Sequence, residues 1–371
     1  MDFVVSSEAV SSGILAKSIP KEYAGIANFR VYPCKPILPS GKIGWRVNNL
    51  LALPVGALKR ACSRHGAIMH VHSPSPVTKP LSISLIKKLI GVPILVDLHD
   101  PWSGYPFSKS PINLLQTGIM RYVIDNADAI VVAHTALIDL VKRVNKNKPV
   151  TLIPNGVDTQ VFQPRPRSLS LMKKLKLGIQ DQIVLFSGHM TEEKGLDLLA
   201  YAAETATKRN HNARFVVIGD GPVRNKIMNI VRKLGLQNFF RFTGFVKTEH
   251  LSDYMSLADI CVCPYKPLPH YDVMKIETPM KVVQYLSVGK PVIMSKVSEE
   301  NVVSWSGGGL LITPGDPEKL AEAIADLLED GLSREIMGKK GRKYVEDNLD
   351  WSSIAKKLIE IYQSLRQKYS D

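Results

Sequence analysis

The stretch that decides the fold of this chain is Lys275-Ile-Glu-Thr-Pro-Met-Lys-Val-Val-Gln-Tyr-Leu-Ser-Val-Gly-Lys-Pro-Val-Ile-Met294. It predicts a short helix with Thr278 as the N-cap and Pro279 as the first helical residue, where a missing N–H does no harm. Gly289 is expected to close the helix. A buried strand, Pro291 to Met294, is expected to follow it.

Another strand, Asp259 to Pro264, is predicted just before this helix. A helix that begins beyond a parallel strand points free N–H groups and the positive end of its dipole at the carboxyl edge of the sheet. A diphosphate group fits such a place. An ordinary αβ unit of a doubly wound sheet, with no ligand, explains the same pattern.

Length and composition favour two domains without a membrane span. The 371 residues are 45% apolar, enough to bury two cores. No uncharged apolar run approaches the roughly 20 residues of a spanning helix, and we find no secretory signal pattern, so we expect a cytoplasmic protein. The four cysteines, Cys34, Cys62, Cys261 and Cys263, lack metal-ligand spacing, and the last two are expected on one face of a strand as core thiols.

Positive charge is concentrated in the first quarter of the chain. The net charge is +14, and Tyr23 to Val96 carries ten Lys or Arg residues without any Asp or Glu. Within it, Lys42 to Arg60 mixes Trp45 and leucines with cations, which suits a surface on anionic lipid headgroups. A solvated basic face over a buried helix and a nucleic-acid patch are the alternatives. No nucleic-acid motif accompanies the charge, so we expect no nucleic-acid partner.

Strands alternate with helices along the chain, which predicts an α/β protein with parallel sheets. We expect an N-terminal domain over 1–162, a proline-rich and charged linker over 163–170, a second domain over 171–350 and a C-terminal helix over 351–371. Polar loops follow the strands at one edge of a parallel sheet, so His70, His72, His99 and Asp100 are expected on one rim. The expected strands lie at 2–5, 66–73, 93–100, 129–133, 150–153, 182–186, 214–218, 239–243, 259–264, 291–294 and 309–312, and the bounded helices at 83–90, 114–126, 135–144, 248–256 and 317–329.

Several segments, in order and spacing, resemble the retaining glycosyltransferases of family 4. That family has the GT-B architecture, two facing Rossmann-like domains with a C-terminal helix that crosses back to the first. The resemblance runs from about residue 66 to the C-terminus. The segments that carry it are His70-Val-His-Ser73, Val96-Asp-Leu-His-Asp100, Ile153-Pro-Asn-Gly-Val-Asp158, Gly188 through Lys194-Gly195, Val217-Ile-Gly-Asp-Gly-Pro222, Phe242-Thr-Gly-Phe-Val246, Ala258-Asp-Ile260, and Thr278-Pro-Met-Lys281 through Gly289-Lys-Pro291.

The resemblance implies a donor diphosphate site in the second domain. The family's diphosphate-binding Arg and Lys correspond to His189 and Lys194, near the loop glycines Gly188 and Gly219. Lys194 would neutralise the leaving group as the glycosidic bond breaks. His189 contributes only when protonated, so donor binding is expected to weaken above a pH of about 6.5. The first turn of the predicted helix, Thr278, Pro279, Met280 and Lys281, is expected to bind the donor as well.

The family's paired glutamates, eight positions apart, are altered in this chain. The second corresponds to Gln284, which still offers one carbonyl acceptor to the ribose, and the first falls on Ile276, next to Glu277. Glu277 is a candidate for contact with a donor-sugar hydroxyl. His99 resembles the family histidine that faces the transferred sugar, and a loop histidine paired with Asp100 is the alternative. Phe245 and Val246 correspond to the backbone that contacts the nucleobase.

Family members usually begin with a strand, a glycine-rich loop and a helix, and residues 1–30 contain no Gly-Gly loop. The N-terminal domain is therefore expected to be pared down or to start upstream.

The resemblance implies transfer of a sugar from a nucleoside-diphosphate sugar to a hydroxyl acceptor, with retention. We expect no metal or cofactor, because Lys194, the Thr278 helix terminus and His189 would neutralise the diphosphate. The basic first quarter suggests a lipid-linked or membrane-surface glycan as acceptor, reached peripherally at the inner face of the cell membrane. A nucleotide-sugar epimerase, a catalytically silent nucleotide-sugar-binding protein and a nucleic-acid binder remain the alternatives.

Overall fold

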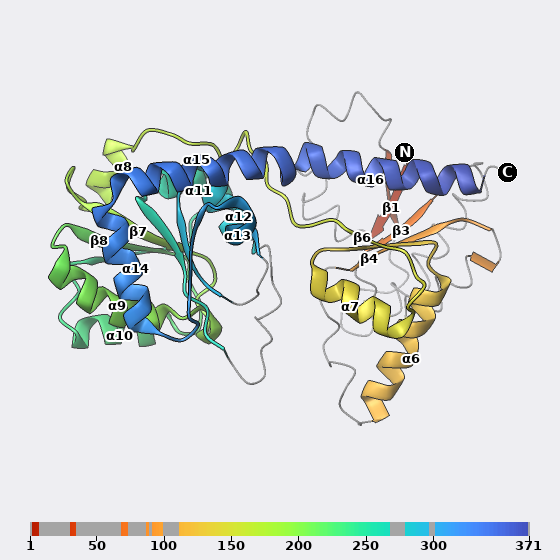
Figure 1. The fold of residues 1–371 in the computed structure, drawn as a ribbon, viewed down its shortest axis with the longest axis horizontal. Coiled ribbons are helices and arrows are strands. Elements are labelled where there is room, and N and C mark those ends of the chain that lie inside the picture. The colour runs from red at the N-terminus through yellow and green to blue at the C-terminus, as the bar shows by residue number, and fades with distance from the viewer. Residues whose placement is uncertain are drawn as a thin grey trace. The chain divides into compact units, whose positions relative to one another are not determined.

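The computed structural model describes residues 2–6, 30–34, 68–72, 87–88, 91–98, 111–267, 279–296 and 301–369. The chain forms two units, one comprising Met1–Ile153 with Leu358–Asp371 and the other Pro154–Lys357 (Figure 1). The expected linker at 163–170 thus lies within the second unit.

Some sequence predictions fall outside the described residues. These include most of the basic region Tyr23 to Val96, with Lys42 to Arg60. The catalytic candidates His99 and Glu277 and the expected N-cap Thr278 also lie there. In the part of the chain that is described, no helix is both long enough and apolar enough to cross a bilayer.

The first unit contains a four-stranded parallel sheet in the order β3-β4-β5-β6. A separate parallel pair joins β1 to β2, and the sequence predicted only the first of these two strands. The elements are β1 (Asp2–Ser6), β2 (Arg30–Cys34), β3 (Met69–His72), β4 (Ile94–Leu98), α6 (Pro111–Asn126), β5 (Ala129–Val132), α7 (Thr135–Val144) and β6 (Val150–Leu152).

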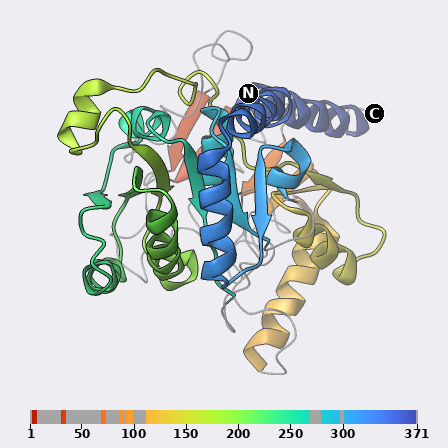
Figure 2. The ribbon, with the colours of Figure 1, turned by 60° about the vertical axis from the view of Figure 1, so that its left-hand side comes forward.

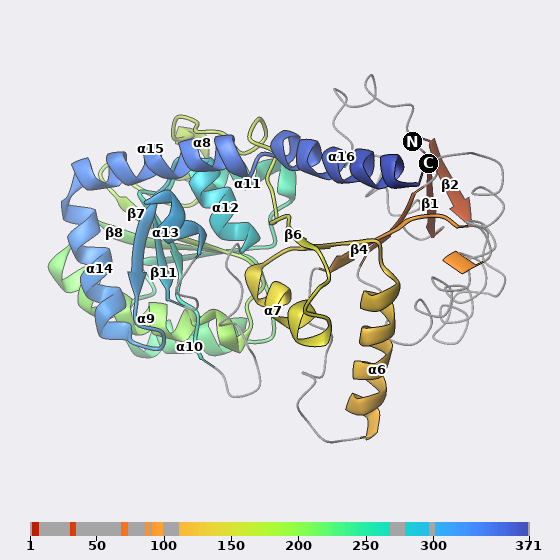
Figure 3. The same ribbon diagram turned by 45° about the vertical axis from the view of Figure 1, so that its right-hand side comes forward.

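Both faces of this sheet are buried, because alternate side chains of a strand point to opposite sides. Ile94, Val96 and Leu98 of β4 pack with residues of α6 and α7. Leu95 faces the other way and packs against the second half of the C-terminal helix α16 (Trp351–Lys368) (Figure 3). The expected return of the terminal helix to the first unit is therefore confirmed.

His70 does not lie on the rim where the sequence placed it. Its Nδ1 is 2.6 Å from the hydroxyl of Tyr362 on α16, and its Nε2 is 3.5 Å from Asp97 Oδ2. The side chain therefore lies on the sheet face that the terminal helix covers. Burial raises the pKa of Tyr362, so its hydroxyl stays protonated and can donate to His70.

The second unit contains a six-stranded parallel sheet in the order β12-β11-β10-β7-β8-β9. Numbered along the unit, this is the 3-2-1-4-5-6 order of the doubly wound Rossmann fold. The elements are α8 (Leu169–Lys174), β7 (Gln182–Ser187), the 3-10 helix η3 (Glu192–Lys194), α9 (Leu196–Arg209), β8 (Ala213–Ile218), α10 (Arg224–Lys233), β9 (Phe240–Gly244), α11 (Thr248–Ser256), β10 (Ile260–Cys263), α12 (Met280–Ser287), β11 (Val292–Ser295), α13 (Val302–Ser306), β12 (Gly309–Ile312), α14 (Pro317–Glu329) and α15 (Gly331–Asn348).

Helices cover both faces of this sheet. α9 and α14 lie side by side on one face, over a core that includes Val184 and Phe186 of β7 (Figure 2). Ile183 and Leu185 point to the opposite face, where they pack with α11, α12 and α15. Cys261 and Cys263 are free and buried on that second face, as expected, and burial raises the pKa of both thiols.

Helix α15 was not predicted from the sequence. It contains Gly338 and Gly341, which disfavour helix in an isolated chain. A Cβ at Gly338 would lie 2.3 Å from the Gly289 carbonyl oxygen, and one at Gly341 would lie 2.7 Å from Leu286 Cδ2. The glycines therefore allow α15 to pack closely on the end of α12, and this packing stabilises the helix.

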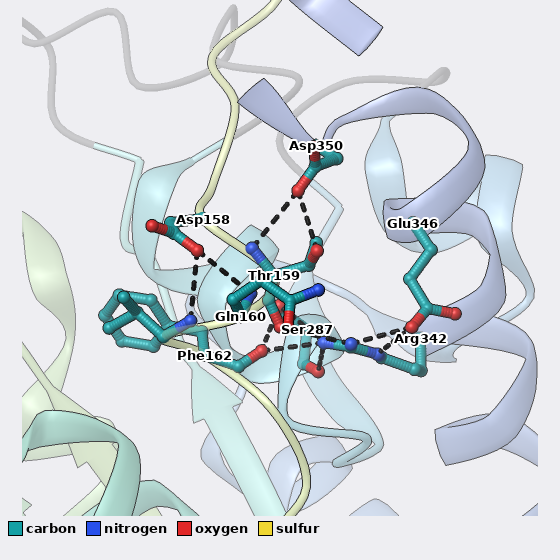
Figure 4. A network of polar contacts seen from close by, with 9 residues as sticks. Asp158, Thr159, Gln160, Phe162, Ser287, Arg342, Glu346 and Asp350 are labelled. Carbon is teal, nitrogen blue, oxygen red and sulfur yellow. Dashed lines mark hydrogen bonds and ion pairs between the residues drawn. The ribbon is translucent and has the colours of Figure 1, made fainter. Parts of the chain in front are cut away.

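The segment that follows β6 is fixed to the second unit through Arg342 of α15 (Figure 4). The Arg342 guanidinium donates to the carbonyl oxygens of Phe162 at 2.7 Å, Ser287 at 2.6 Å and Thr159 at 3.1 Å. The Thr159 hydroxyl donates to Asp350 at 2.7 Å. These bonds satisfy the free carbonyl of Ser287 at the end of α12 and hold 159–162 against it.

Candidate functional site

Three strand ends meet at the carboxyl edge of the second sheet. The Gly188 amide donates to the Ile218 carbonyl, and the Gly219 amide donates to the Gly244 carbonyl, each at 2.9 Å. Gly219 has φ +123°, and a Cβ there would lie 2.0 Å from the Gly188 carbonyl oxygen. Gly219 therefore needs to be glycine, because the loops after β7 and β8 touch there through their backbones, and Gly188 favours glycine because its φ is +138°.

Helix α12 approaches the same edge beside β7. The Ser187 amide donates to the Tyr285 hydroxyl at 2.6 Å, and that hydroxyl lies 3.1 Å from Ser187 Oγ. Strand order reverses between β7 and β10, which is the point where doubly wound sheets bind their ligands. Tyr285 thus fixes α12 at this switch point.

The two ends of α12 compare differently with the prediction. Pro279 is not the first helical residue, because its ψ of 129° is extended and its carbonyl accepts from Val282 and Val283, so it is the N-cap. The C-terminus is as expected. Gly289 has φ +71° and donates to the Leu286 carbonyl, while Lys290 donates to the Tyr285 carbonyl, which together form a Schellman motif.

Lys281 lies one turn before Tyr285 on the same side of α12. Its Nζ is 4.1 Å from the centre of the Phe186 ring, and a Cβ at Gly188 would come within 2.5 Å of it. The pKa of this ammonium is lowered to about 8, chiefly by burial; Lys194 acts in the same direction, and Cys263 and Glu193 act against it. Lys281 therefore reaches the loop after β7 from the helix beneath it.

Lys194 ends the 3-10 turn in that loop. Its Nζ lies 3.4 Å from Glu193 Oε1 and 5.0 Å from the centre of the Tyr265 ring, just after β10. Neighbouring ion pairs hold the turn, since Lys266 binds Glu192 at 3.2 Å and Asp197 at 2.8 Å. Hydrogen bonds from Lys226 and then Lys266 hold the pKa of Glu192 below its usual value.

The other predicted site residues that the structure describes are less enclosed. His189 is exposed, and so are Phe245, at 79%, and Met280, at 43%. Val246 is half-buried against the core, and Gln284 is half-buried one turn after Lys281. In the described ranges, no three His, Cys, Asp or Glu side chains form a group that could hold a metal ion.

Phe186 and Tyr285 contribute to the site but were not singled out from the sequence. Phe186 ends the predicted strand 182–186, and Tyr285 follows Gln284 in the predicted helix. The four-residue spacing from Lys281 to Tyr285 is a signal that both side chains lie on one face of the helix.

Two family models match almost all of the chain. The model described as Glycosyltransferase Family 4 matches residues 14–161, and the model described as Glycosyl transferases group 1 matches residues 170–344. The chain belongs to this glycosyltransferase family. Its two parallel α/β units and its structural neighbours give it the GT-B fold.

Relatives of this glycosyltransferase include proteins of several kinds. An uncharacterized glycosyltransferase of Methanocaldococcus jannaschii is 27% identical over 58% of this chain and 54% of its own, so the match spans about half of that relative. A GDP-mannose-dependent alpha-(1-6)-phosphatidylinositol monomannoside mannosyltransferase of Mycobacterium tuberculosis is 26% identical over 70% of this chain and 66% of its own. The Anabaena protein HepE, solved in complex with UDP, shares the fold at a TM-score of 0.69 and 17% identity, over 91% of this chain and 86% of its own.

Proposed function

We propose that the protein transfers a sugar from a nucleoside-diphosphate sugar to a hydroxyl acceptor, with retention of the anomeric configuration and without a metal. The observation that carries this proposal is the edge of the second sheet at its switch point. There the glycine loops after β7 and β8 expose backbone, and Lys194 and Lys281 supply positive charge. The UDP complex of HepE, a protein of the same fold, supports a nucleotide donor.

Lys194 is proposed to stabilise the leaving diphosphate, because negative charge grows on it as the glycosidic bond breaks. The ion pairs of Lys266 hold the turn that carries Lys194, so the charge is oriented before the donor arrives. Phe245 and Val246 are proposed to lie near the base and Gln284 near the ribose. His99 and Glu277 remain proposed for contact with the sugar.

The acceptor is proposed to be a glycan that is lipid-linked or lies on a membrane surface, which the protein would reach as a peripheral protein on the cytoplasmic side. The mycobacterial relative, whose printed name specifies a phosphatidylinositol mannoside, supports this class. The basic composition of Tyr23 to Val96 supports it as well. Vesicle flotation tests it. Equal partitioning onto neutral and anionic vesicles at low salt would contradict the lipid part of the proposal.

The central test replaces Lys194 with alanine. Lys194→Ala is expected to lower turnover about 100-fold with the matched donor, because one preorganised charge at the leaving group is lost. Lys226→Ala is the control, since Lys226 is a more exposed lysine that pairs with Glu192 near the same turn. The donor is found by measuring thermal shifts with the common nucleoside-diphosphate sugars.

Three results would reject the proposed reaction. Activity of Lys194→Ala within a few fold of the wild type would remove the leaving-group role. Conversion of the donor to an isomer without any acceptor would indicate an epimerase. Donor binding with neither hydrolysis nor transfer, across a panel of glycan acceptors, would indicate a silent binding protein.

A further inference from the structure

A buried ammonium without a polar partner lies at the switch point of the second sheet. Among the residues that the structure describes, Lys281 Nζ is shielded from solvent and has no hydrogen-bond partner. Its close neighbour is the face of Phe186, a fully buried ring. A cation over a ring recovers only about 2 kcal/mol, whereas removing an ammonium from water costs several. An anionic ligand would complete the surroundings of Lys281.

Among the residues that the structure describes, the charged and titratable groups near Lys281 do not supply that anion. Burial keeps the Cys263 thiol protonated by raising its pKa. Glu193 lies 3.4 Å from Lys194 and also accepts from Thr191, so its carboxylate is already engaged. Lys194 is the remaining neighbour, and it adds a second positive charge. Two lysines and one glutamate leave a positive local balance, which favours an anionic ligand.

The position of Lys281 also explains how this chain differs from its family. The resemblance assigns the first diphosphate cation to His189, which is exposed in this structure. The space beside the neighbouring Gly188, where a Cβ would lie, is limited by Lys281 Nζ at 2.5 Å. A cation therefore reaches the backbone of this loop from α12. The flexible stem of a lysine lets its ammonium move toward an anion bound there.

We propose that Lys281 is the second cation of the diphosphate site and binds the donor's diphosphate together with Lys194, in the role that the family gives to an arginine at the position of His189. This inference rests on the proposed function. It predicts that diphosphate binding is strong while Lys281 is protonated and is lost as the pH rises past about 8. Binding through His189 would instead be lost when His189→Ala removes the imidazole.

The test measures binding by titration calorimetry with UDP, GDP and inorganic pyrophosphate as probes. Two variants, Lys281→Met and Lys281→Gln, are compared with the wild type at pH 7, and both are expected to bind UDP or GDP about 10- to 100-fold more weakly. Binding of the parent nucleosides is expected to stay unchanged. Lys290→Met is the matched control, because Lys290 follows the other end of α12, near Asp259 and Arg167, and should bind within twofold of the wild type.

The pH series distinguishes the two candidate cations. The affinity of the wild type for UDP or GDP is expected to fall about tenfold between pH 7 and pH 9. The affinity of Lys281→Met is expected to stay constant over the same range. His189→Ala is expected to behave as the wild type does over this range. Circular dichroism and thermal unfolding verify that each variant is folded. If Lys281→Met does not fold, Lys281→Gln takes its place in the binding experiments.

The outcomes separate this inference from the proposed function. If the wild type binds UDP or GDP and both Lys281 variants bind equally well, the inference is wrong while the proposed function stands. If His189→Ala weakens UDP or GDP binding about 10- to 100-fold while both Lys281 variants bind as the wild type does, His189 is the second cation and the inference is again wrong. If the wild type binds none of the diphosphates, both the inference and the proposed function are wrong.

Discussion

Replacing Lys281 with methionine is expected to stabilise the ligand-free protein at pH 7. Burial lowers the pKa of Lys281 from 10.5 to about 8, which corresponds to about 3 kcal/mol because one pKa unit is about 1.4 kcal/mol. Below pH 8 the ammonium is charged in both states and the folded state carries this full cost. Between pH 8 and 10.5 the unfolded chain binds more protons, so the stability of the wild type rises with pH.

Methionine keeps most of the length of the lysine side chain and removes its charge. The gain in stability is therefore expected in the unit Pro154–Lys357. Differential scanning calorimetry of the ligand-free protein checks it. For a unit of this size, about 3 kcal/mol raises the unfolding midpoint by about 6 to 12 °C. The difference between variant and wild type is expected at pH 7 and should shrink toward pH 10, where the wild-type lysine is largely neutral in the folded state.

Lys343→Met controls for a general effect of removing positive charge, because Lys343 is 79% exposed on α15. It should leave the midpoint nearly unchanged at both pH values. A Lys281→Met variant that is less stable than the wild type at pH 7 would show that the ammonium is compensated in the folded protein. A gain of equal size at pH 7 and pH 10 would show that it arises from packing rather than from charge.

Two further substitutions test the architecture around the site. Gly219→Ala is expected to lower the free energy of unfolding by about 2 to 4 kcal/mol, because the new Cβ meets the Gly188 carbonyl oxygen and the residue has a positive φ. Urea denaturation measures this loss. A loss below about 0.5 kcal/mol would contradict the close approach of the two loops. Arg342→Met is expected to lower the free energy of unfolding by about 3 kcal/mol, because three carbonyls lose a charged donor. The control, Lys343→Met, changes the neighbouring residue and should lower it by almost nothing. Similar urea midpoints for the two variants would mean that the Arg342 hydrogen bonds contribute little.

The sequence predicted the fold well where local signals agree with packing. Thr248–Ser256, Gly309–Ile312 and Pro317–Glu329 have the predicted bounds. At the last of these, Asp316 accepts from the amides of Glu318 and Lys319 beside a proline at the helix start, so one short segment contains the whole signal. Helix α15 also has an N-cap, Asp330, but the glycines in its interior are explained by close packing on Leu286 and Gly289, which are distant in sequence.

The sequence predicted which residues surround the candidate site better than it predicted which of them are buried. Gly188 and Gly219 were identified from loop motifs, and the structure brings their loops together. His189 and Lys281 were both named as donor-binding residues, yet their burial differs because it depends on tertiary packing. The ammonium of Lys281 is enclosed by Phe186 of β7, and no pattern within the α12 sequence indicates that neighbour.

Helix α12 connects the candidate site to the segment that leaves the first unit. Its first turn carries Lys281, and its middle is fixed to β7 by the hydrogen bond between Tyr285 and Ser187. At its end, Arg342 donates both to the Ser287 carbonyl and to the Phe162 carbonyl. An eight-residue helix has no flexible joint between its first turn and its last, because its backbone hydrogen bonds run through its whole length. We therefore expect a movement of 159–162 to be felt along α12 as far as the ammonium beside Gly188. Diphosphate binding at Lys281 should, by the same contacts, restrain that segment.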